Sequence, residues 1–161
     1  MILAAKYTIY RIIFDPIFTM KVLMISTDRS ILAEGSAPRA RMAEYGGLVE
    51  ELHVIIFSRK NYNSKFLIFN SKLKSKVTIS KNVFAYPTDS LGRWFYIFDT
   101  YFLANRRIRN WKLEIGNSRD QQLLITSQDP FETGLVGVLL KRRFSVPLQI
   151  QIHTDFLSPH F

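Results

Sequence analysis

The sequence predicts an α/β fold: one doubly wound, mostly parallel sheet with helices on both faces, in a single Rossmann-like domain. Near-continuous apolar runs at residues 21–27 and 51–58 are typical of strands covered on both faces. Segments with helical spacing of apolar residues alternate with such runs, as in a chain of crossover units. The 161 residues, 47% of them hydrophobic, suffice for one packed core, and no break in composition divides them.

The composition also excludes several classes of site. The absence of cysteine removes disulfides, thiolate catalysis and thiolate metal ligands, and it suits a reducing cytoplasm. The three histidines, at 53, 153 and 160, match no zinc spacing, so we expect no metal. The net charge of +9 favours an anionic partner. Nucleic acid is not the expected partner, because charge is its only support and no motif that reads bases is present.

The first part of the chain predicts an extension, a strand and a helix. Residues 1–19 are interpreted as an N-terminal extension that the domain does not require, and residues 20–161 as the domain itself. The apolar run at 21–27 is the expected central strand, followed by a polar loop at 28–35. Ser36 is expected to cap a helix over 37–45, which Gly46 and Gly47 end, and 51–58 is a second buried strand.

The middle of the chain predicts a loop, a strand and one long helix. Residues 59–80 indicate a loop around a short strand at 66–69, and residues 77–87 a further strand. Apolar residues at 94, 97, 98, 101, 108 and 111 predict an amphipathic helix over 90–112 whose last turns are basic. The favoured interpretation is a core helix with a solvated basic end; docking on anionic lipid is the alternative.

The last part predicts a strand at 123–126, a tight turn, a helix and a strand at 148–152 that delivers His153, Thr154 and Asp155. Ligands of parallel sheets bind at the carboxyl ends of strands. Because of this position, a functional His153 and a satisfied core histidine both remain open hypotheses.

Two further motifs have competing interpretations. Asp129 and Glu132 resemble a catalytic carboxylate pair, but Asp129 at the N-cap, proline next and Glu132 at the third position are better explained as a helix start. Gly35 and Ser36 are consistent with either a phosphate cradle or a simple turn and cap. Arg29 follows the central strand directly, so we expect it near any ligand.

Four segments give the chain a resemblance to a known family: MKVLMISTD (20–28), RARMAEYGGLVEELHVIIFS (39–58), ITSQDPFETGLVGVLLKRRFSVPL (125–148) and QIQIHTD (149–155). In order and spacing, residues 20–161 resemble the N-terminal, acceptor-side domain of retaining GT-B fold glycosyltransferases of family 4. Such enzymes continue into a second domain that binds the nucleotide-sugar. The expectation is therefore that this chain supplies only the acceptor wall and shows no turnover alone.

The resemblance also implies roles for individual residues. It implies that His153 is catalytic, that Arg29, Gly35 and Ser36 lie in a loop facing the donor phosphates, and that five residues bind the acceptor: Gln128, Asp129, Phe131, Thr154 and Asp155. A nucleotide-sugar is the implied co-substrate, with no cofactor or metal, and the acceptor is a sugar or a lipid-linked sugar. The implied location is the cytoplasm, peripheral on the inner membrane face. The alternative hypothesis is a non-catalytic α/β module that binds an anionic ligand or partner.

Overall fold

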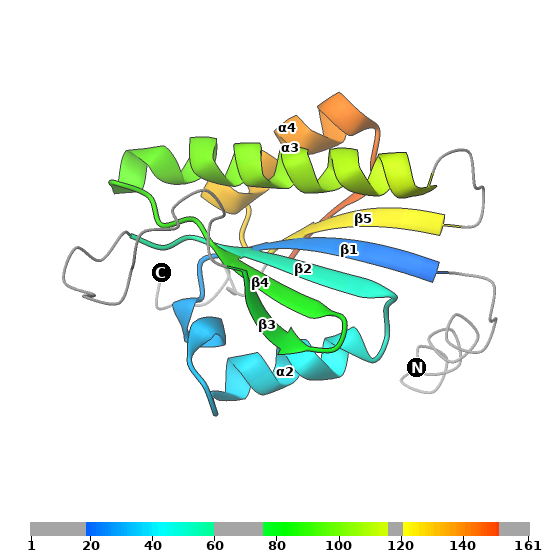
Figure 1. Ribbon diagram of the computed structural model, residues 1–161. Helices are drawn as coiled ribbons and strands as arrows, with labels where there is room; N and C mark the ends of the chain where they lie inside the picture. The colour runs from blue at the N-terminus through cyan, green and yellow to red at the C-terminus, as the bar shows by residue number, and fades with distance from the viewer. Residues whose placement is uncertain (1–18, 60–75, 116–120, 152–161) are drawn as a thin grey trace, which may run out of the picture.

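The computed structural model describes residues 19–59, 76–115 and 121–151, and it confirms the predicted α/β fold (Figure 1). One six-stranded sheet runs in the order β3-β4-β2-β1-β5-β6. The strands are β1 (Thr19–Ser26), β2 (Glu51–Ile56), β3 (Val77–Ser80), β4 (Val83–Pro87), β5 (Gln121–Ser127) and β6 (Leu148–Ile150). The helices are α2 (Ala37–Gly46), α3 (Tyr96–Ile115) and α4 (Glu132–Phe144), with short 3-10 turns η1 (Arg29–Leu32) and η2 (Arg93–Phe95).

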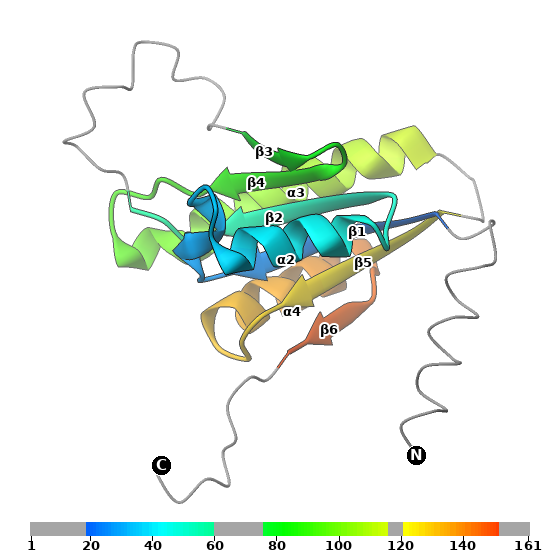
Figure 2. The same ribbon diagram turned by 90° about the horizontal axis from the view of Figure 1, so that it is seen from below.

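The sheet is parallel except for β3, which pairs antiparallel with β4 at one edge. Helix α2 covers one face, and α3 and α4 lie side by side on the other (Figures 1 and 2). β1 is central, with β2 on one side and β5 on the other. From β1 the chain winds outward through β2 to β4, and from β5 it winds outward in the opposite direction to β6. The winding therefore reverses between β1 and β5.

The core consists of two layers, one on each face of the sheet, and β1 contributes alternate residues to them. Leu23 and Ile25 pack on the side of α3 and α4, whereas Val22 and Met24 pack on the side of α2. This alternation follows from the period of two residues along a strand. Both layers are apolar, which explains why the run in β1 is nearly continuous.

The single strand predicted over 77–87 is wrong, because this segment forms a hairpin of β3 and β4. Lys81 and Asn82 make the turn between the two strands. The Asn82 side-chain amide donates to the carbonyl oxygens of Gly46, at 2.7 Å, and Val49, at 3.0 Å. These bonds attach the hairpin to the end of α2. Asparagine is a common turn residue, and here its side chain also supplies tertiary contacts.

The long helix predicted over 90–112 exists, but its start and its buried face differ from the prediction. The segment begins as η2 and becomes α-helical at Tyr96. Residues of one stripe pack on the sheet: Tyr96, Thr100, Ala104, Ile108 and Trp111. Trp94 and Phe98, which the spacing assigned to the apolar face, are exposed. The small residues Thr100 and Ala104 are part of the buried face, whereas the rings of Trp94, Phe98 and Phe102 are exposed.

Other expectations agree with the structure or lie outside the residues it describes. Ser36 caps α2, accepting a hydrogen bond from the Arg39 N–H at 3.2 Å. β6 ends at Ile150, two residues earlier than predicted. The strand expected at 66–69 falls outside the described residues, as does the extension predicted at 1–19 except for Thr19, which begins β1. Within the three described ranges, no helix is both long enough and apolar enough to cross a membrane.

Candidate functional site

The carboxyl ends of β1 and β5 lie together at the centre of the sheet, where the winding reverses. Their register pairs Ile25 with Ser127. Ligand crevices of open α/β sheets form at such a point. Gln128 spans it, because its backbone N–H donates to the carbonyl oxygen of Ile25 at 3.1 Å and its side-chain oxygen accepts a bond from the Ser26 hydroxyl. Two cavities open beside this point, and Thr27 lines both of them.

One of these cavities, which we call the arginine pocket, has a volume of about 410 Å³. Arg29 follows β1, Arg59 follows β2, and Arg93 lies in η2. Its other lining residues are Thr27, Phe57, Tyr96 and Glu132. Three guanidinium groups against one carboxylate make the walls positively charged. Guanidinium groups bind phosphate and carboxylate with matching planar geometry, so an anionic group is the ligand that suits these walls.

Arg29 is held in a defined position within the arginine pocket. Its Nε donates to the carbonyl oxygen of Phe57 at 3.1 Å, and its Nη2 donates to the Tyr96 hydroxyl at 3.0 Å. One partner comes from the end of β2 and the other from the start of α3. A guanidinium group has five N–H donors, so these two bonds leave donors for a ligand. Fixing the group in advance lowers the entropic cost of binding.

Arg93 and Arg59 are held more loosely than Arg29. The Arg93 Nε lies 3.5 Å from a carboxylate oxygen of Glu132, and both side chains are solvent-accessible. Such exposed pairs contribute little stability, so an incoming anion can compete with the Glu132 carboxylate. The backbone of Arg59 forms an isolated parallel bridge with Ser90, which places it beside the segment leading into η2.

The predicted phosphate loop contains one pocket residue and two residues with structural roles. Gly35 has φ of +75°, a conformation that favours glycine, and a Cβ there would meet no atom within 4 Å. The Ser36 hydroxyl donates to the carbonyl oxygen of Ser30 at 2.6 Å while capping α2. Neither residue is among those lining the arginine pocket. Their role in phosphate binding stays a prediction, whereas Arg29 lies in the pocket.

Asp129 starts α4, though not in the register that the sequence predicted. The helix begins at Glu132, with Phe131 rather than Asp129 at the N-cap. The Asp129 carboxylate nevertheless accepts hydrogen bonds from the backbone N–H groups of Phe131, at 3.0 Å, and Thr133, at 3.4 Å. The turn at Pro130 and Phe131 precedes the first helical residue, and the Asp129 carboxylate spans this turn to bond to the helix start. Asp129 therefore organises the helix start, and the Phe131 ring is exposed.

The predicted catalytic residue His153 lies outside the described residues, as do Thr154 and Asp155, so their roles stay predictions. His53 is described and is buried in β2, with its Nε2 at 2.6 Å from a carboxylate oxygen of Glu51. Burial lowers the pKa of His53 to about 4, although the Glu51 carboxylate opposes that change. His53 is therefore neutral at physiological pH, and it is not among the residues that line the arginine pocket.

The second cavity, of about 310 Å³, opens between α2 and the end of β5. Its polar lining residues include Asp28, Arg41, Gln128 and Gln151. The Asp28 carboxylate is already engaged, because it accepts a bond from the Ser30 backbone N–H at 2.9 Å. The positive charge of Arg41 is offset by the negative charge of Asp28, so this cavity should attract anions less strongly than the arginine pocket does.

The sequence did not predict that Phe57, Arg59, Arg93 and Tyr96 line a pocket, and it indicated Glu132 only as part of a carboxylate pair or a helix start. Arg59 could have been found, because it follows a buried strand in the same way that Arg29 does. Arg93 gave no such signal, since it precedes a helix and reaches the pocket only through the path of η2. Among the described residues, no group of three acidic or histidine side chains is placed to hold a metal ion.

Comparison with known proteins leaves the family of this chain open. No protein-family model matches the chain, and no curated protein sequence shows a significant match to it.

Proposed function

We propose that this chain is the acceptor-binding, N-terminal domain of a nucleotide-sugar-dependent glycosyltransferase, and that the arginine pocket holds an anionic group of the bound ligand. The observation that carries the proposal is the convergence of Arg29, Arg59 and Arg93 at the carboxyl edge of the sheet. The sequence resemblance supplies the reaction class. The position beside the reversal of winding supports ligand binding at this edge.

The proposed chemistry depends on positioning. In such a transfer, an acceptor hydroxyl must approach the anomeric carbon while positive charge develops on the sugar and a diphosphate departs. The arginine pocket would fix the ligand through its phosphoryl or carboxylate group. His153, Thr154 and Asp155 would contact the sugar, with Gln128, Asp129 and Phe131 on the wall of the acceptor cleft.

A second candidate function is a non-catalytic module that binds an anionic ligand or partner. It is favoured by the geometry of the arginine pocket, where two hydrogen bonds fix Arg29 beside Arg59 and Arg93. Binding through them needs no catalytic residue. The two candidates share the pocket and differ only in whether transfer follows.

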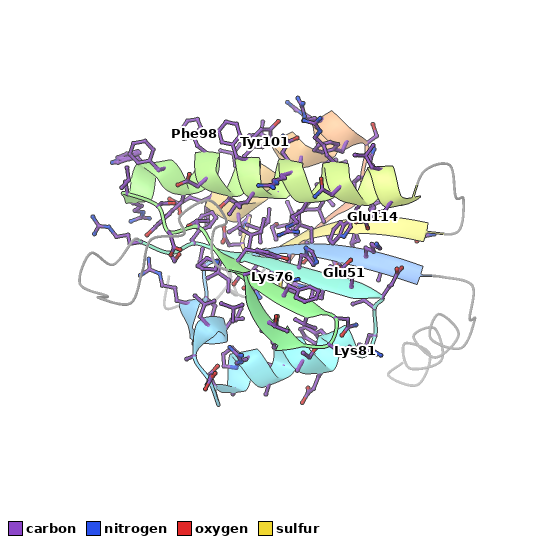
Figure 3. The ribbon with its side chains drawn as sticks, viewed as in Figure 1. Glu51, Lys76, Lys81, Phe98, Tyr101 and Glu114 are labelled. Carbon is purple, nitrogen blue, oxygen red and sulfur yellow. The ribbon has the colours of Figure 1, made fainter. Side chains whose placement is uncertain are left out.

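Calorimetric titration with inorganic pyrophosphate tests the pocket itself. Arg29→Gln and Arg59→Gln should each weaken binding about tenfold, because each removes a charge-assisted hydrogen-bond donor. Lys81→Gln, at the β3–β4 turn (Figure 3), is the matched control and should bind as the parent chain does. If Lys81→Gln weakened pyrophosphate binding equally, binding would depend only on the net charge of the chain. If only Arg41→Gln weakened pyrophosphate binding, the anion would bind in the second cavity, which Arg41 lines.

An assay of sugar transfer separates the two candidates. It is run with a nucleotide-sugar and with the donor-binding domain that such enzymes carry. His153→Ala should abolish transfer and leave pyrophosphate binding unchanged. Full transfer by His153→Ala would remove this residue from the site. Intact pyrophosphate binding without any transfer, across a panel of nucleotide-sugars, would favour the binding module.

A further inference from the structure

Large apolar side chains are exposed on the outer side of η2, α3 and α4. Trp94 is 90% exposed, Phe98 63% and Phe102 65%. Figure 3 shows Phe98 pointing away from the sheet. We call the following set the aromatic surface: Leu91, Trp94, Phe95, Phe98, Phe102, Phe131, Leu135 and Leu139. An apolar patch of this kind on a folded domain marks an interaction site.

The two helices that carry the aromatic surface run side by side in the same direction. At one end Arg93 meets Glu132 at 3.5 Å. Further along, Arg143 Nε, near the end of α4, donates to the side-chain oxygen of Asn105 in the middle of α3 at 3.1 Å, and Lys112 Nζ donates to the carbonyl oxygen of Phe144 at 2.6 Å. The exposed aromatic residues of these helices lie in their amino-terminal halves, their basic residues lie in the other halves, and the exposed Leu113 lies among the basic residues.

The basic end gives this side of the molecule a positive charge. Helices α3 and α4 together contain seven cationic residues against three carboxylates. The cations are Arg106, Arg107, Arg109, Lys112, Lys141, Arg142 and Arg143. Most of them are exposed, as the aromatic rings are. An apolar area bordered by lysine and arginine is the pattern that binds the interface of an anionic bilayer.

We infer that the aromatic surface docks this domain on an anionic lipid bilayer, with its rings in the headgroup region and the basic ends of α3 and α4 on the lipid phosphates. Tryptophan is favoured at that depth, because its ring is apolar and its N–H remains hydrated. A second copy of the chain is a poorer occupant, because each copy carries a net charge of +9 and would bring the same basic helix ends to the contact.

Flotation of the full chain with vesicles tests the inference. Vesicles of phosphatidylcholine with phosphatidylglycerol should bind the chain, and vesicles of phosphatidylcholine alone should bind it at least tenfold more weakly. The double variant Phe98→Ser with Phe102→Ser should lose at least tenfold of the binding to anionic vesicles, because its apolar insertion is removed. The double variant Arg106→Gln with Arg109→Gln should lose most of the preference for phosphatidylglycerol.

The control variant is Leu48→Ser, which removes a side chain of similar exposure (60%) located just after α2. It should float as the parent chain does. The substituted side chains of the aromatic variant are exposed, so its thermal unfolding should match that of the parent, which separates lost docking from lost folding. Unchanged flotation of the aromatic variant would overturn the inference. The inference would also be overturned if the parent chain did not bind vesicles and instead formed a dimer in sedimentation velocity that the aromatic variant abolishes.

The chain's two tryptophans provide an independent optical measurement. Trp94 is almost fully exposed, whereas Trp111 is 3% exposed and bonds to Glu51. Anionic vesicles should shift the fluorescence emission to the blue, because Trp94 leaves water. Trp94→Phe should remove that shift and retain most of the flotation. A shift that persists in Trp94→Phe would come from Trp111 and would contradict docking through this surface.

Discussion

The two edges of the sheet both carry charged side chains and use them differently. At the amino edge, Lys21 Nζ lies 3.0 Å from a carboxylate oxygen of Glu114 and 3.6 Å from one of Glu51 (Figure 3). Glu51 also bonds to His53 Nε2 at 2.6 Å and accepts from Trp111 Nε1 at 3.0 Å. The charged groups at this edge are thus engaged with groups of the protein itself, and the carboxylates that face Lys21 outnumber it.

At the carboxyl edge the excess is of cations. Arg29, Arg59 and Arg93 share the arginine pocket with one carboxylate, that of Glu132. The bonds of Arg29 go to a carbonyl oxygen and a hydroxyl, which orient the guanidinium without neutralising it. The difference shows that charge at a sheet edge is informative only with its partners: charged groups engaged by other groups of the protein indicate stability, and cations in excess of the nearby carboxylates indicate an anionic ligand.

The largest expected effect is on stability at the amino edge. Glu51→Ala removes the acceptor of two buried donors, His53 Nε2 and Trp111 Nε1, and should lower the free energy of unfolding by about 3 kcal/mol. Urea unfolding measures it, with Glu44→Ala on α2 as the matched loss of a carboxylate. Pyrophosphate binding should be unchanged in folded Glu51→Ala. If binding fell as much as in Arg29→Gln, the two edges would not be independent.

The next largest effect is a pH dependence of the free energy of unfolding, which originates at the same amino edge. Burial lowers the pKa of His53 to about 4 in the folded chain, and Arg107 and Lys76 act in the same direction against Glu51. In the unfolded chain this pKa is about 6.5. Between these values only the unfolded state binds the proton, so the stabilising contribution is complete above pH 6.5 and is lost as the pH falls toward 4.

This loss should amount to about 2–3 kcal/mol in urea unfolding measured across that pH range. The pKa of Glu51 adds a change of the same sign: burial raises it, but the bond from His53 and the nearby positive charges outweigh burial and lower it. A His53→Gln variant should show a flatter pH profile. An equally steep profile in that variant would assign the dependence to other groups.

The smallest effect is expected at the carboxyl edge. Arg59→Gln should change the free energy of unfolding by less than about 0.5 kcal/mol, because the side chain is exposed and is surrounded by like charges. The same variant should lose anion binding, as proposed above. A loss of more than about 1 kcal/mol in the free energy of unfolding, larger than surface substitutions usually cause, would show that Arg59 serves the fold, and the contrast between the edges would disappear.

The sequence predicted the strands better than it predicted which helix face is buried. A strand such as β1 contributes Leu23 to one core layer and Met24 to the other, so its apolar run specifies burial on both faces. Over η2 and α3, the spacing of large apolar residues correctly assigned Ile108 and Trp111 to the buried face. It also assigned Trp94 and Phe98, which are exposed, and it left out Thr100 and Ala104, whose small side chains allow close packing on the sheet.

The candidate site was predicted in part. A strand-end rule was enough for Arg29, because it depends on one local element. The arginine pocket also needs Arg59, Arg93 and Glu132, which come from segments far apart in the chain and meet only through the order of strands. No local pattern specifies that meeting. The expected turn and cap at Gly35 and Ser36 were both confirmed.

The parallel arrangement of α3 and α4 has a further electrostatic consequence. Both helices start at the carboxyl edge, and Tyr96 and Glu132, the first residue of each, line the arginine pocket. The peptide dipoles of both helices therefore direct their positive ends toward the same cavity. This part of the potential belongs to the backbone, so no side-chain substitution can delete it. A chain without the three arginines should retain a weak, salt-sensitive attraction for anions at this edge.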